Sequence, residues 1–454
     1  MKNIVSAQHA YFATGSTKDV KFRIEQLTKL ESLLKNNEEL LNKAIYDDFK
    51  KSSFENYLTE LSLLYHDIKE AKRNLYRWAR RQKVSTNVAN FPAKSYIVPE
   101  PLGVCLVIGA WNYPYQLSLA PAVAALAAGN TVIIKPSELP NNTAQAMATL
   151  INKNFPADYF HVVQGGVPET TELLKQQFDK IFFTGSTKVG KIVYKAAAEN
   201  LTPVTLEMGG KSPAFVTKDC NLKITVKRMI WAKFLNAGQT CIAPDYVLID
   251  KHIESEFLEL AKKEIIETKY AYENDNYLQI INTDNLERLE KMLDPDKIYF
   301  GGEVHKETRY MQPTLMHKVT FNDAVMQEEI FGPILPVISY TTLDEAIAEV
   351  NKHSKPLSCY AFTNEKKSKT KILESISFGG GAINEAVMHI TNPKLPFGGV
   401  GKSGIGSYHG KAGFDCFTHY KSILDKPTWL ELPIKYSPHS NTKLKWLKRL
   451  FKLQ

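Results

Sequence analysis

The spacing of hydrophobic positions changes about a hundred residues into the chain. Residues 18–83 carry Lys, Glu, Leu and Asn at helical spacing and contain no proline. This pattern predicts two or three amphipathic surface helices whose charged residues face solvent. From about Tyr96, short β-branched runs alternate with helical stretches. Such alternation is typical of a parallel sheet with crossover helices.

The alternating pattern predicts a doubly wound α/β fold with a mainly parallel sheet, followed by a second α/β region from about 209 to 390. In the first region the predicted strands are 103–108, 131–134, 160–163, 180–183 and 204–206, and the predicted helices are 118–128, 143–154, 169–177 and 189–199. In the second region we expect strands at 247–249, 334–338 and 358–362.

One stretch, Val104 to Ile134, has no charged residue, which raises the alternative of a membrane span. Glycine, proline and asparagine interrupt the stretch repeatedly. The interruptions favour strand, loop, Ala-rich helix and strand, in a parallel sheet buried on both faces.

Composition and cysteine content indicate an intracellular globular protein. The 454 residues are 44% hydrophobic and 23% charged. Five cysteines without a CxxC pair argue against a disulfide framework and for a reducing compartment. The N-terminus has no apolar core of a secretory signal, so we expect a cytoplasmic protein. Cys416 and His419 form a lone C-x-x-H, and we expect no metal.

Basic residues are concentrated at the C-terminus. The net charge is +9, and five of the basic residues fall in the last dozen positions, which leaves about +4 for the rest of the chain. No basic-aromatic array suits a nucleic acid, so that class of partner is set aside. On a helical wheel, residues 443–454 place one set of side chains on an apolar half and another on a basic half, with only Lys443 out of place. The apolar set is Leu444, Trp446, Leu447, Leu450, Phe451 and Leu453, and the basic set is Lys445, Lys448, Arg449 and Lys452.

This basic amphipathic tail favours peripheral contact with an anionic membrane surface, because twelve residues are too few to span a bilayer. Docking on the protein itself, docking on a partner subunit, and a frayed end remain open alternatives.

Polar residues follow four of the predicted strands. Asn112 lies in GAWNYP, Lys135 in KPSE, the turn FTGST follows 180–183, and Glu207 ends an apolar run before two glycines. Each feature alone is more often an ordinary turn. Together, at neighbouring strand ends of an open α/β sheet, they indicate a functional edge.

A single cysteine, Cys241, lies in the loop FLNAGQTCIAPDY. Read from its loop alone, a buried structural cysteine and a reactive one are about equally favoured. Neither a histidine nor a lysine is adjacent, so a Cys-His hydrolase would need one of the eleven histidines from elsewhere.

Seven segments in order resemble the NAD(P)-dependent aldehyde dehydrogenases, in particular their class 3 branch, which acts on fatty or aromatic aldehydes. The resemblance covers residues 10–430. The segments are GAWNYP, KPSE, FTGST, LEMGGKSP, GQTCIAPDY, QEEIFGP and LPFGGVGKSG.

The resemblance implies catalytic roles for Cys241, Glu207 and Asn112. Cys241 would be the nucleophile that forms a thiohemiacetal and then a thioester. Asn112 and the Cys241 backbone N–H would hold the oxyanion. Glu207 would be the general base for hydrolysis, and its presence disfavours acyl transfer to coenzyme A.

The resemblance also implies a nicotinamide cofactor. Lys135 and Glu138 would contact the adenosine ribose, and Glu329 and Phe331 would hold the nicotinamide end. Gly185 and Ser186 would form the pyrophosphate turn at a helix start, and Gly190 would belong to the same cofactor-binding set. We expect NAD, with NADP as the alternative, because Glu138 would repel a 2′-phosphate.

By resemblance the fold has a Rossmann-like cofactor domain (1–81 and 103–207), a catalytic domain (208–393) and a bridging element (82–102 and 394–430) that pairs two subunits. Residues 431–454 form the tail. We expect a homodimer that oxidises medium- or long-chain, aromatic or other lipophilic aldehydes to carboxylic acids. The alternatives are a carotenoid-aldehyde-specific dehydrogenase, a cysteine esterase or acyl-transferring relative, and a non-catalytic relative that kept the fold.

Overall fold

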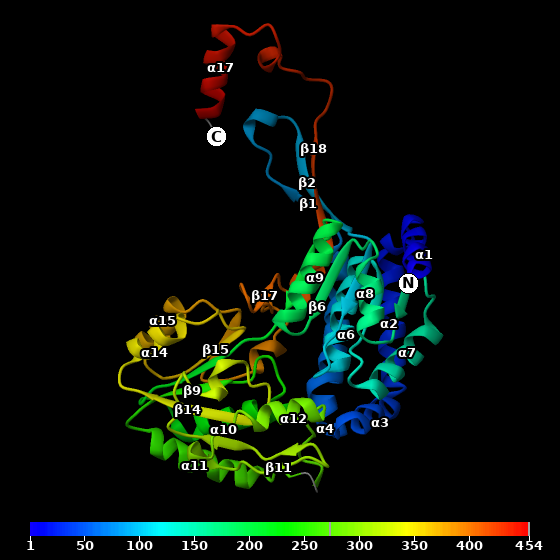
Figure 1. The fold of residues 1–454 in the computed structure, drawn as a ribbon. Helices are drawn as coiled ribbons and strands as arrows, with labels where there is room; N and C mark the ends of the chain where they lie inside the picture. The colour runs from blue at the N-terminus through cyan, green and yellow to red at the C-terminus, as the bar shows by residue number, and fades with distance from the viewer. Residues whose placement is uncertain (272–273, 453–454) are drawn as a thin grey trace.

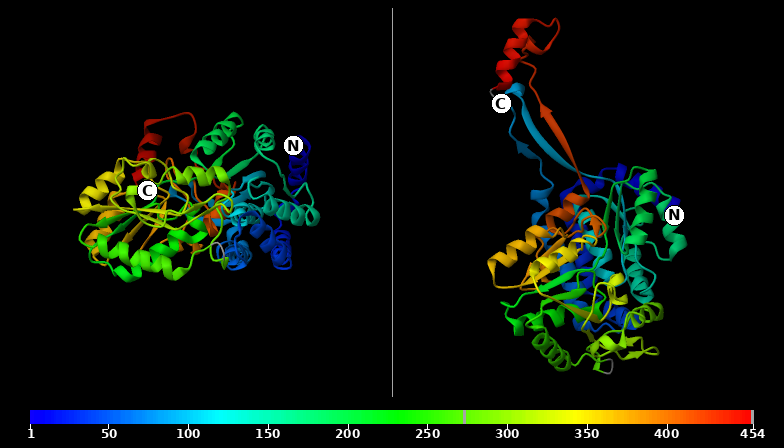
Figure 2. Two further views of the ribbon diagram at one scale, coloured as in Figure 1. Left: turned by 60° about the horizontal axis from the view of Figure 1, so that its bottom comes forward. Right: turned by 60° about the vertical axis from the view of Figure 1, so that its left-hand side comes forward.

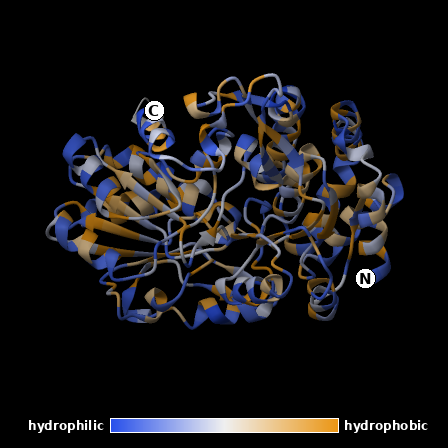
Figure 3. Cartoon of the chain, turned by 90° about the horizontal axis from the view of Figure 1, so that it is seen from above, coloured by the Kyte–Doolittle hydropathy of each residue, from blue (hydrophilic) through white to orange (hydrophobic). Residues whose placement is uncertain are grey.

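The computed structural model describes residues 1–271 and 274–452. Two lobes, each built on its own sheet, lie side by side, and a slender arm projects from them (Figure 1). The strands of both sheets are largely hydrophobic in colour, while the outer faces of the surrounding helices are hydrophilic (Figure 3).

The first lobe contains a six-stranded sheet in the order β17-β7-β6-β3-β4-β5. Its central strands are parallel and fully buried, because helices cover both faces and the strands are apolar on both sides. The strands are β3 (Val104–Ile108), β4 (Thr131–Lys135), β5 (Phe160–Val162), β6 (Lys180–Thr184) and β7 (Val204–Glu207). The crossover helices are α6 (Pro114–Ala128), α7 (Asn141–Asn154), α8 (Val167–Leu174) and α9 (Thr187–Glu199). The predicted alternation is confirmed, and the uncharged stretch is strand, helix and strand.

The N-terminal helices pack around this lobe, with α2 and α5 against α6. Their bounds are α1 (Lys2–Ala13), α2 (Val20–Lys35), α3 (Glu38–Phe49), α4 (Ser53–Asn56), the π-helical turn η2 (Tyr57–Leu61) and α5 (Ser62–Trp78). The expectation that the charges here face solvent is wrong for Lys51 and Glu60, whose side chains are 0% exposed. Their burial arises because other segments cover them.

The second lobe contains a seven-stranded sheet in the order β10-β13-β14-β9-β8-β15-β16. All its pairings are parallel except that of β10 with β13. The strands are β8 (Pro213–Val216), β9 (Tyr246–Asp250), β10 (Ile298–Phe300), β13 (Thr314–Met316), β14 (Ile334–Tyr340), β15 (Ser358–Phe362) and β16 (Gly380–Ile383). The helices are α10 (Leu222–Phe234), α11 (Glu254–Thr268), α12 (Thr283–Glu290), α14 (Leu343–Asn351) and α15 (Lys366–Ser375).

The arm is a three-stranded antiparallel sheet that extends away from both lobes (Figure 2). It consists of β1 (Gln82–Val84), β2 (Lys94–Pro101) and β18 (Thr418–Asp425). The expected bridging segment 394–430 is divided in the structure. Within it, β17 (Gly404–Ile405) pairs antiparallel with β7, and Gly404 lies opposite Glu207. A later part of the same segment, α16 (Gly410–Cys416), packs against α6.

The tail forms helix α17 (Asn441–Lys452), which contacts the tip of the β1–β2 hairpin at η3 (Val88–Asn90). Leu444, Trp446 and Phe451 are exposed. Lys443, which did not fit the wheel, donates hydrogen bonds to backbone carbonyls of the preceding turn. Leu453, part of the expected apolar face, lies outside the described residues. No helix in the described parts of the chain has both the length and the apolar character needed to cross a bilayer.

Candidate active site

A cavity of about 880 Å³ lies where the two lobes meet. The first lobe contributes the carboxyl ends of β3, β4, β6 and β7, which are adjacent in the parallel part of its sheet. The second lobe contributes the segments just before β8, β9 and β14. The carboxyl edge of one parallel sheet therefore faces the amino edge of another, and loops from both converge on one space.

The loop that carries Cys241 is held in an unusual backbone conformation. Asn236, Ala237 and Gly238 are successive left-handed residues, with φ of 56°, 51° and 72°. A side chain at Gly238 would overlap the carbonyl of Gly332, so only glycine fits this close approach. α10 ends at Phe234, and the reversal that follows Leu235 brings the next residues, including Cys241, to the cavity wall.

The Cys241 thiol is protonated in this setting. Burial raises its pKa to about 12, and the nearby carboxylates of Glu329 and Glu207 add to the increase. A thiol with a raised pKa becomes a nucleophile only when a base removes its proton.

Glu207 is placed to be that base. It ends β7 and is 3% exposed, and no donor among the described residues contacts either of its carboxyl oxygens. Burial raises its pKa well above the usual value. A buried carboxylate without partners is a stronger base than one in water, and it faces the cavity that Cys241 also lines.

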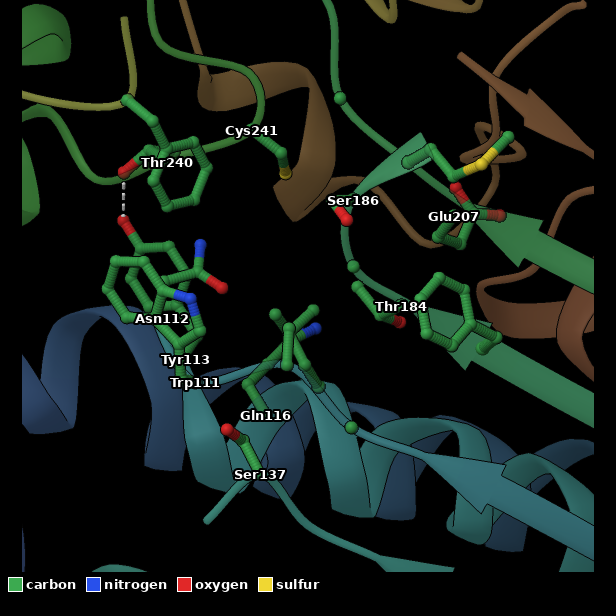
Figure 4. A pocket seen from close by; sticks show the side chains of 18 of the residues that line it. Trp111, Asn112, Tyr113, Gln116, Ser137, Thr184, Ser186, Glu207, Thr240 and Cys241 are labelled. Carbon is green, nitrogen blue, oxygen red and sulfur yellow. Dashed lines mark hydrogen bonds between the residues drawn. The ribbon is translucent and has the colours of Figure 1, made fainter. Parts of the chain in front are cut away.

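Asn112 is tied to the cysteine loop by two hydrogen bonds. Its side-chain Nδ2 donates to the carbonyl of Gln239 at 3.0 Å, and its own carbonyl accepts from Asn236 Nδ2 at 2.9 Å. In Figure 4 the side chains of Asn112, Cys241 and Glu207 come from three segments and surround the same space. Within residues 1–271 and 274–452, the Asn112 Nδ2 has Gln239 as its only acceptor, which leaves its second N–H to donate to a ligand, as an oxyanion donor must.

At the other end of the cavity, Lys135 is the last residue of β4. Its ammonium donates to the Pro136 carbonyl at 2.7 Å and lies 4.0 Å from a carboxylate oxygen of Glu138. Burial lowers the pKa of Lys135, and Glu138 partly opposes that effect. The Glu138 side chain is 49% exposed and lines the cavity rim.

The turn after β6 leads into α9. Ser186 caps this helix by accepting from the Val189 N–H at 3.3 Å, and Gly185 and Ser186 line the cavity. Gly190, which we expected in the cofactor site, is not among the lining residues. It is buried on the side of α9 toward Met208, and a side chain there would overlap the Met208 sulfur. Its role is close packing of helix and strand.

Glu329 and Phe331 come from the segment before β14. Phe331 has a φ of 50° and packs edge-on against Trp111 at 5.2 Å between ring centroids. A bulky residue held in the left-handed region is characteristic of functional sites. Burial raises the pKa of Glu329 to about 8, with Asp245 adding to the effect.

The cavity suits a dinucleotide. A helix N-terminus of the kind that binds phosphate faces it at α9, and the adjacent Thr184 hydroxyl is buried without a partner among the described residues. Apolar side chains of α8 and α9 also line the cavity and can pack against a flat base: Val167, Leu174, Val189, Ile192 and Val193.

Sequence reasoning missed several lining residues. Tyr113 and Thr240 are joined by a hydrogen bond of 2.5 Å between their hydroxyls (Figure 4). Their positions next to Asn112 and Cys241 in the sequence could have indicated that they line the site. Arg288 donates hydrogen bonds to the carbonyls of Glu329 and Ile330 and so holds the loop 328–330 in place. The sequence of its own helix gives no indication of these contacts.

Comparisons with known proteins agree with this geometry. The aldehyde dehydrogenase family model matches residues 1–423. The 4,4′-diaponeurosporen-aldehyde dehydrogenase of Staphylococcus aureus is 46% identical over 447 residues, covering 98% of this chain and 97% of the relative. The dimeric NADP-preferring aldehyde dehydrogenase of Mus musculus is 44% identical over 426 residues, covering 93% and 94%.

Among solved structures, the substrate-bound state of Staphylococcus aureus AldH matches with a TM-score of 0.97 and 45% identity, covering 99% of both chains. The similarity extends over both lobes and the arm, and it confirms the family resemblance. The chain therefore belongs to the aldehyde dehydrogenase family and is an NAD(P)-dependent oxidoreductase that acts on aldehydes.

Proposed function

We propose that the chain oxidises lipophilic aldehydes to carboxylic acids through a covalent intermediate on Cys241, with Glu207 as general base and Asn112 as oxyanion donor. The observation that carries this proposal is that the unpartnered, buried Glu207 carboxylate and the Cys241 thiol line the same cavity.

Glu207 takes the proton of the Cys241 thiol, and the sulfur attacks the aldehyde carbonyl to form a thiohemiacetal. The Asn112 amide and the Cys241 backbone N–H donate to the oxygen as it gains charge. Bound NAD(P) supplies the hydride acceptor for the oxidation. Glu207 passes the thiol proton to solvent before hydrolysis. It then deprotonates a water molecule that attacks the Cys241 thioester, and the leaving thiolate takes up that proton, which releases the acid and restores the thiol.

The substrate class follows from the lining near Cys241. The walls of the cavity that Cys241 lines include aliphatic and aromatic side chains, namely Leu58, Leu63, Trp231, Leu235, Met388, Ile390 and Phe397. An apolar wall favours fatty, aromatic or polyene aldehydes over small polar ones. The name of the Staphylococcus aureus relative specifies a carotenoid aldehyde, which supports a polyene aldehyde as the more specific candidate.

The test is formation of NADH and NADPH across linear aldehydes of increasing length and a polyene aldehyde. We expect kcat/KM to rise with chain length and Cys241→Ala to abolish turnover. Cys220→Ala, outside the cavity lining, is the matched control and should retain activity. Ester hydrolysis by Cys241 without any reduced cofactor would instead support the esterase alternative and contradict the proposal.

We further propose a cytoplasmic homodimer with peripheral membrane contact. The edge strand β18 and the exposed arm supply a surface for a second copy, and the mouse relative is named dimeric. The exposed apolar side chains of α17 beside its basic residues support contact with an anionic bilayer. The free cysteines fit a reducing compartment.

A further inference from the structure

A buried ion pair lies beneath the active site, and the mechanism above does not use it. Lys51 Nζ lies 2.8 Å from Glu60 Oε1, and both side chains are 0% exposed. Taking two charges out of water costs free energy that their attraction often does not recover, so stability alone is a weak reason for the pair. Its contacts point to the loops that carry Asn112 and Cys241.

The Glu60 carboxylate holds the start of α6. Its Oε2 accepts from the backbone N–H of Tyr115 at 2.7 Å and of Gln116 at 3.2 Å. These are among the first N–H groups of the helix, which have no partners within it, and a carboxylate there also complements the helix dipole. Asn112 lies two residues before the helix begins, so Glu60 fixes the position from which Asn112 projects.

Lys51 contacts the residue that joins the two catalytic loops. Its ammonium lies 4.3 Å from the ring centroid of Tyr113, within the range of a cation–π contact. The Tyr113 hydroxyl bonds to Thr240 Oγ1 at 2.5 Å. Tyr113 follows Asn112 and Thr240 precedes Cys241 in the chain, so this hydrogen bond joins the neighbours of the two residues that carry the proposed oxyanion donors.

Glu55, from the same short segment, holds the other loop. Its Oε1 accepts from the backbone N–H of Asn236 at 2.6 Å, within the left-handed run before Cys241. The Asn236 side chain in turn donates to the carbonyls of Asn112 and Gln239. Residues 51–60 thus contact the Asn112 loop and the Cys241 loop at once.

We propose that Lys51 and Glu60, together with Glu55, are positioning residues that set the spacing between the Asn112 amide and the Cys241 backbone N–H. This inference rests on the proposed function, which assigns those two donors to the oxyanion. The three residues act through Tyr113, α6 and Asn236 and do not touch the reacting atoms.

The test is a double-mutant cycle between Lys51→Met and Asn112→Ala, measured as kcat and KM for a good aldehyde substrate. We expect Asn112→Ala alone to lower kcat by about 100-fold, as loss of an oxyanion donor does. Lys51→Met should lower kcat by about 10-fold with little change in KM, and Lys51→Arg should restore most of the loss. In the Asn112→Ala background, Lys51→Met should have almost no further effect.

Two further measurements separate positioning from general damage. Alkylation of Cys241 by iodoacetamide involves no oxyanion, so its rate should be unchanged in Lys51→Met. Lys180→Met, which removes another buried lysine bonded to Thr205, is the matched control and should show no coupling to Asn112→Ala. If Lys51→Met fails to fold, Tyr113→Phe takes its place in the double-mutant cycle with Asn112→Ala. This variant keeps the Lys51–Glu60 ion pair and removes only the hydrogen bond to Thr240.

The outcomes are distinct. The inference would be overturned if the double variant lost kcat by the full product of the two single losses, which would mean that Lys51 and Asn112 act independently. It would also be overturned if Lys180→Met lowered kcat as much as Lys51→Met does. Full activity of Asn112→Ala would overturn the oxyanion role in the proposed function itself.

Discussion

The carboxylate of Glu329 lies directly over the Cα of Gly209. A methyl group added at Gly209 would overlap Glu329 Oε2, and the neighbouring Gly210 N–H bonds to the same carboxylate. The glycine pair after Glu207 therefore does more than make a turn. It gives Glu329 the space to reach the cavity, and it links the segment after Glu207 to the segment that carries Glu329.

Gly209→Ala should displace Glu329 and weaken cofactor binding. We expect the Kd for NAD to rise about 10-fold, which corresponds to roughly 1.4 kcal/mol, with little change in melting temperature. Titration followed by protein fluorescence measures it. Gly413→Ala, in α16 against Ala124, is a control outside the cavity. An unchanged Kd would show that Glu329 does not depend on this space.

Glu207→Gln should stabilise the fold increasingly as pH rises. Burial raises the folded-state pKa of Glu207 far above the value of about 4.3 in an unfolded chain, so its favourable contribution is complete below that unfolded value and is lost as pH rises toward the folded one. Glutamine does not titrate and avoids this loss. Melting temperatures of both proteins between weakly acidic and alkaline pH test the prediction. A constant difference at every pH would contradict it.

Glu138→Gln should shift cofactor preference toward NADP. The half-exposed carboxylate lies beside Lys135 at the cavity rim, and its charge opposes a 2′-phosphate. We expect the ratio of kcat/KM for NADP to that for NAD to rise about tenfold, a modest value because solvent screens the site. Glu172→Gln, on α8 and paired with Lys175 outside the lining, should leave the ratio unchanged.

Removal of residues 441–454 should release the protein from membranes. Wild type should sediment with vesicles rich in anionic lipid and less with zwitterionic ones, because both the apolar face and the positive charges contribute. The deletion variant should stay in the supernatant with aldehyde oxidation intact. Equal sedimentation of the wild type and the deletion variant would contradict membrane contact through the tail.

Light scattering on both proteins should give twice the mass of one chain, as expected for a homodimer. A lower mass for the deletion variant would show instead that α17 packs against the partner subunit.

The sequence by itself determined the α/β alternation and the order of chemistry along it. Short apolar runs predicted β3 to β7 within a residue or two, because strands buried on both faces must be apolar throughout. The residues Asn112, Lys135 and Glu207 were visible as polar groups at strand ends. Seven ordered motifs, including the one around Cys241, identified the family.

Only the tertiary structure decided which charges are buried and what they touch. Lys51 and Glu60 lie in a stretch that looks like a solvated helical surface, yet segments that follow them by about fifty residues or more enclose both. Gly190 is expected among the cofactor-binding residues, and only the folded chain shows that it packs against Met208. The raised pKa values of Cys241 and Glu207 likewise depend on desolvation by distant segments. The local sequence pattern predicts helices, strands and turns. Which side chains are buried, and which groups they contact, depends on residues that are far apart in the chain and come together only in the folded protein.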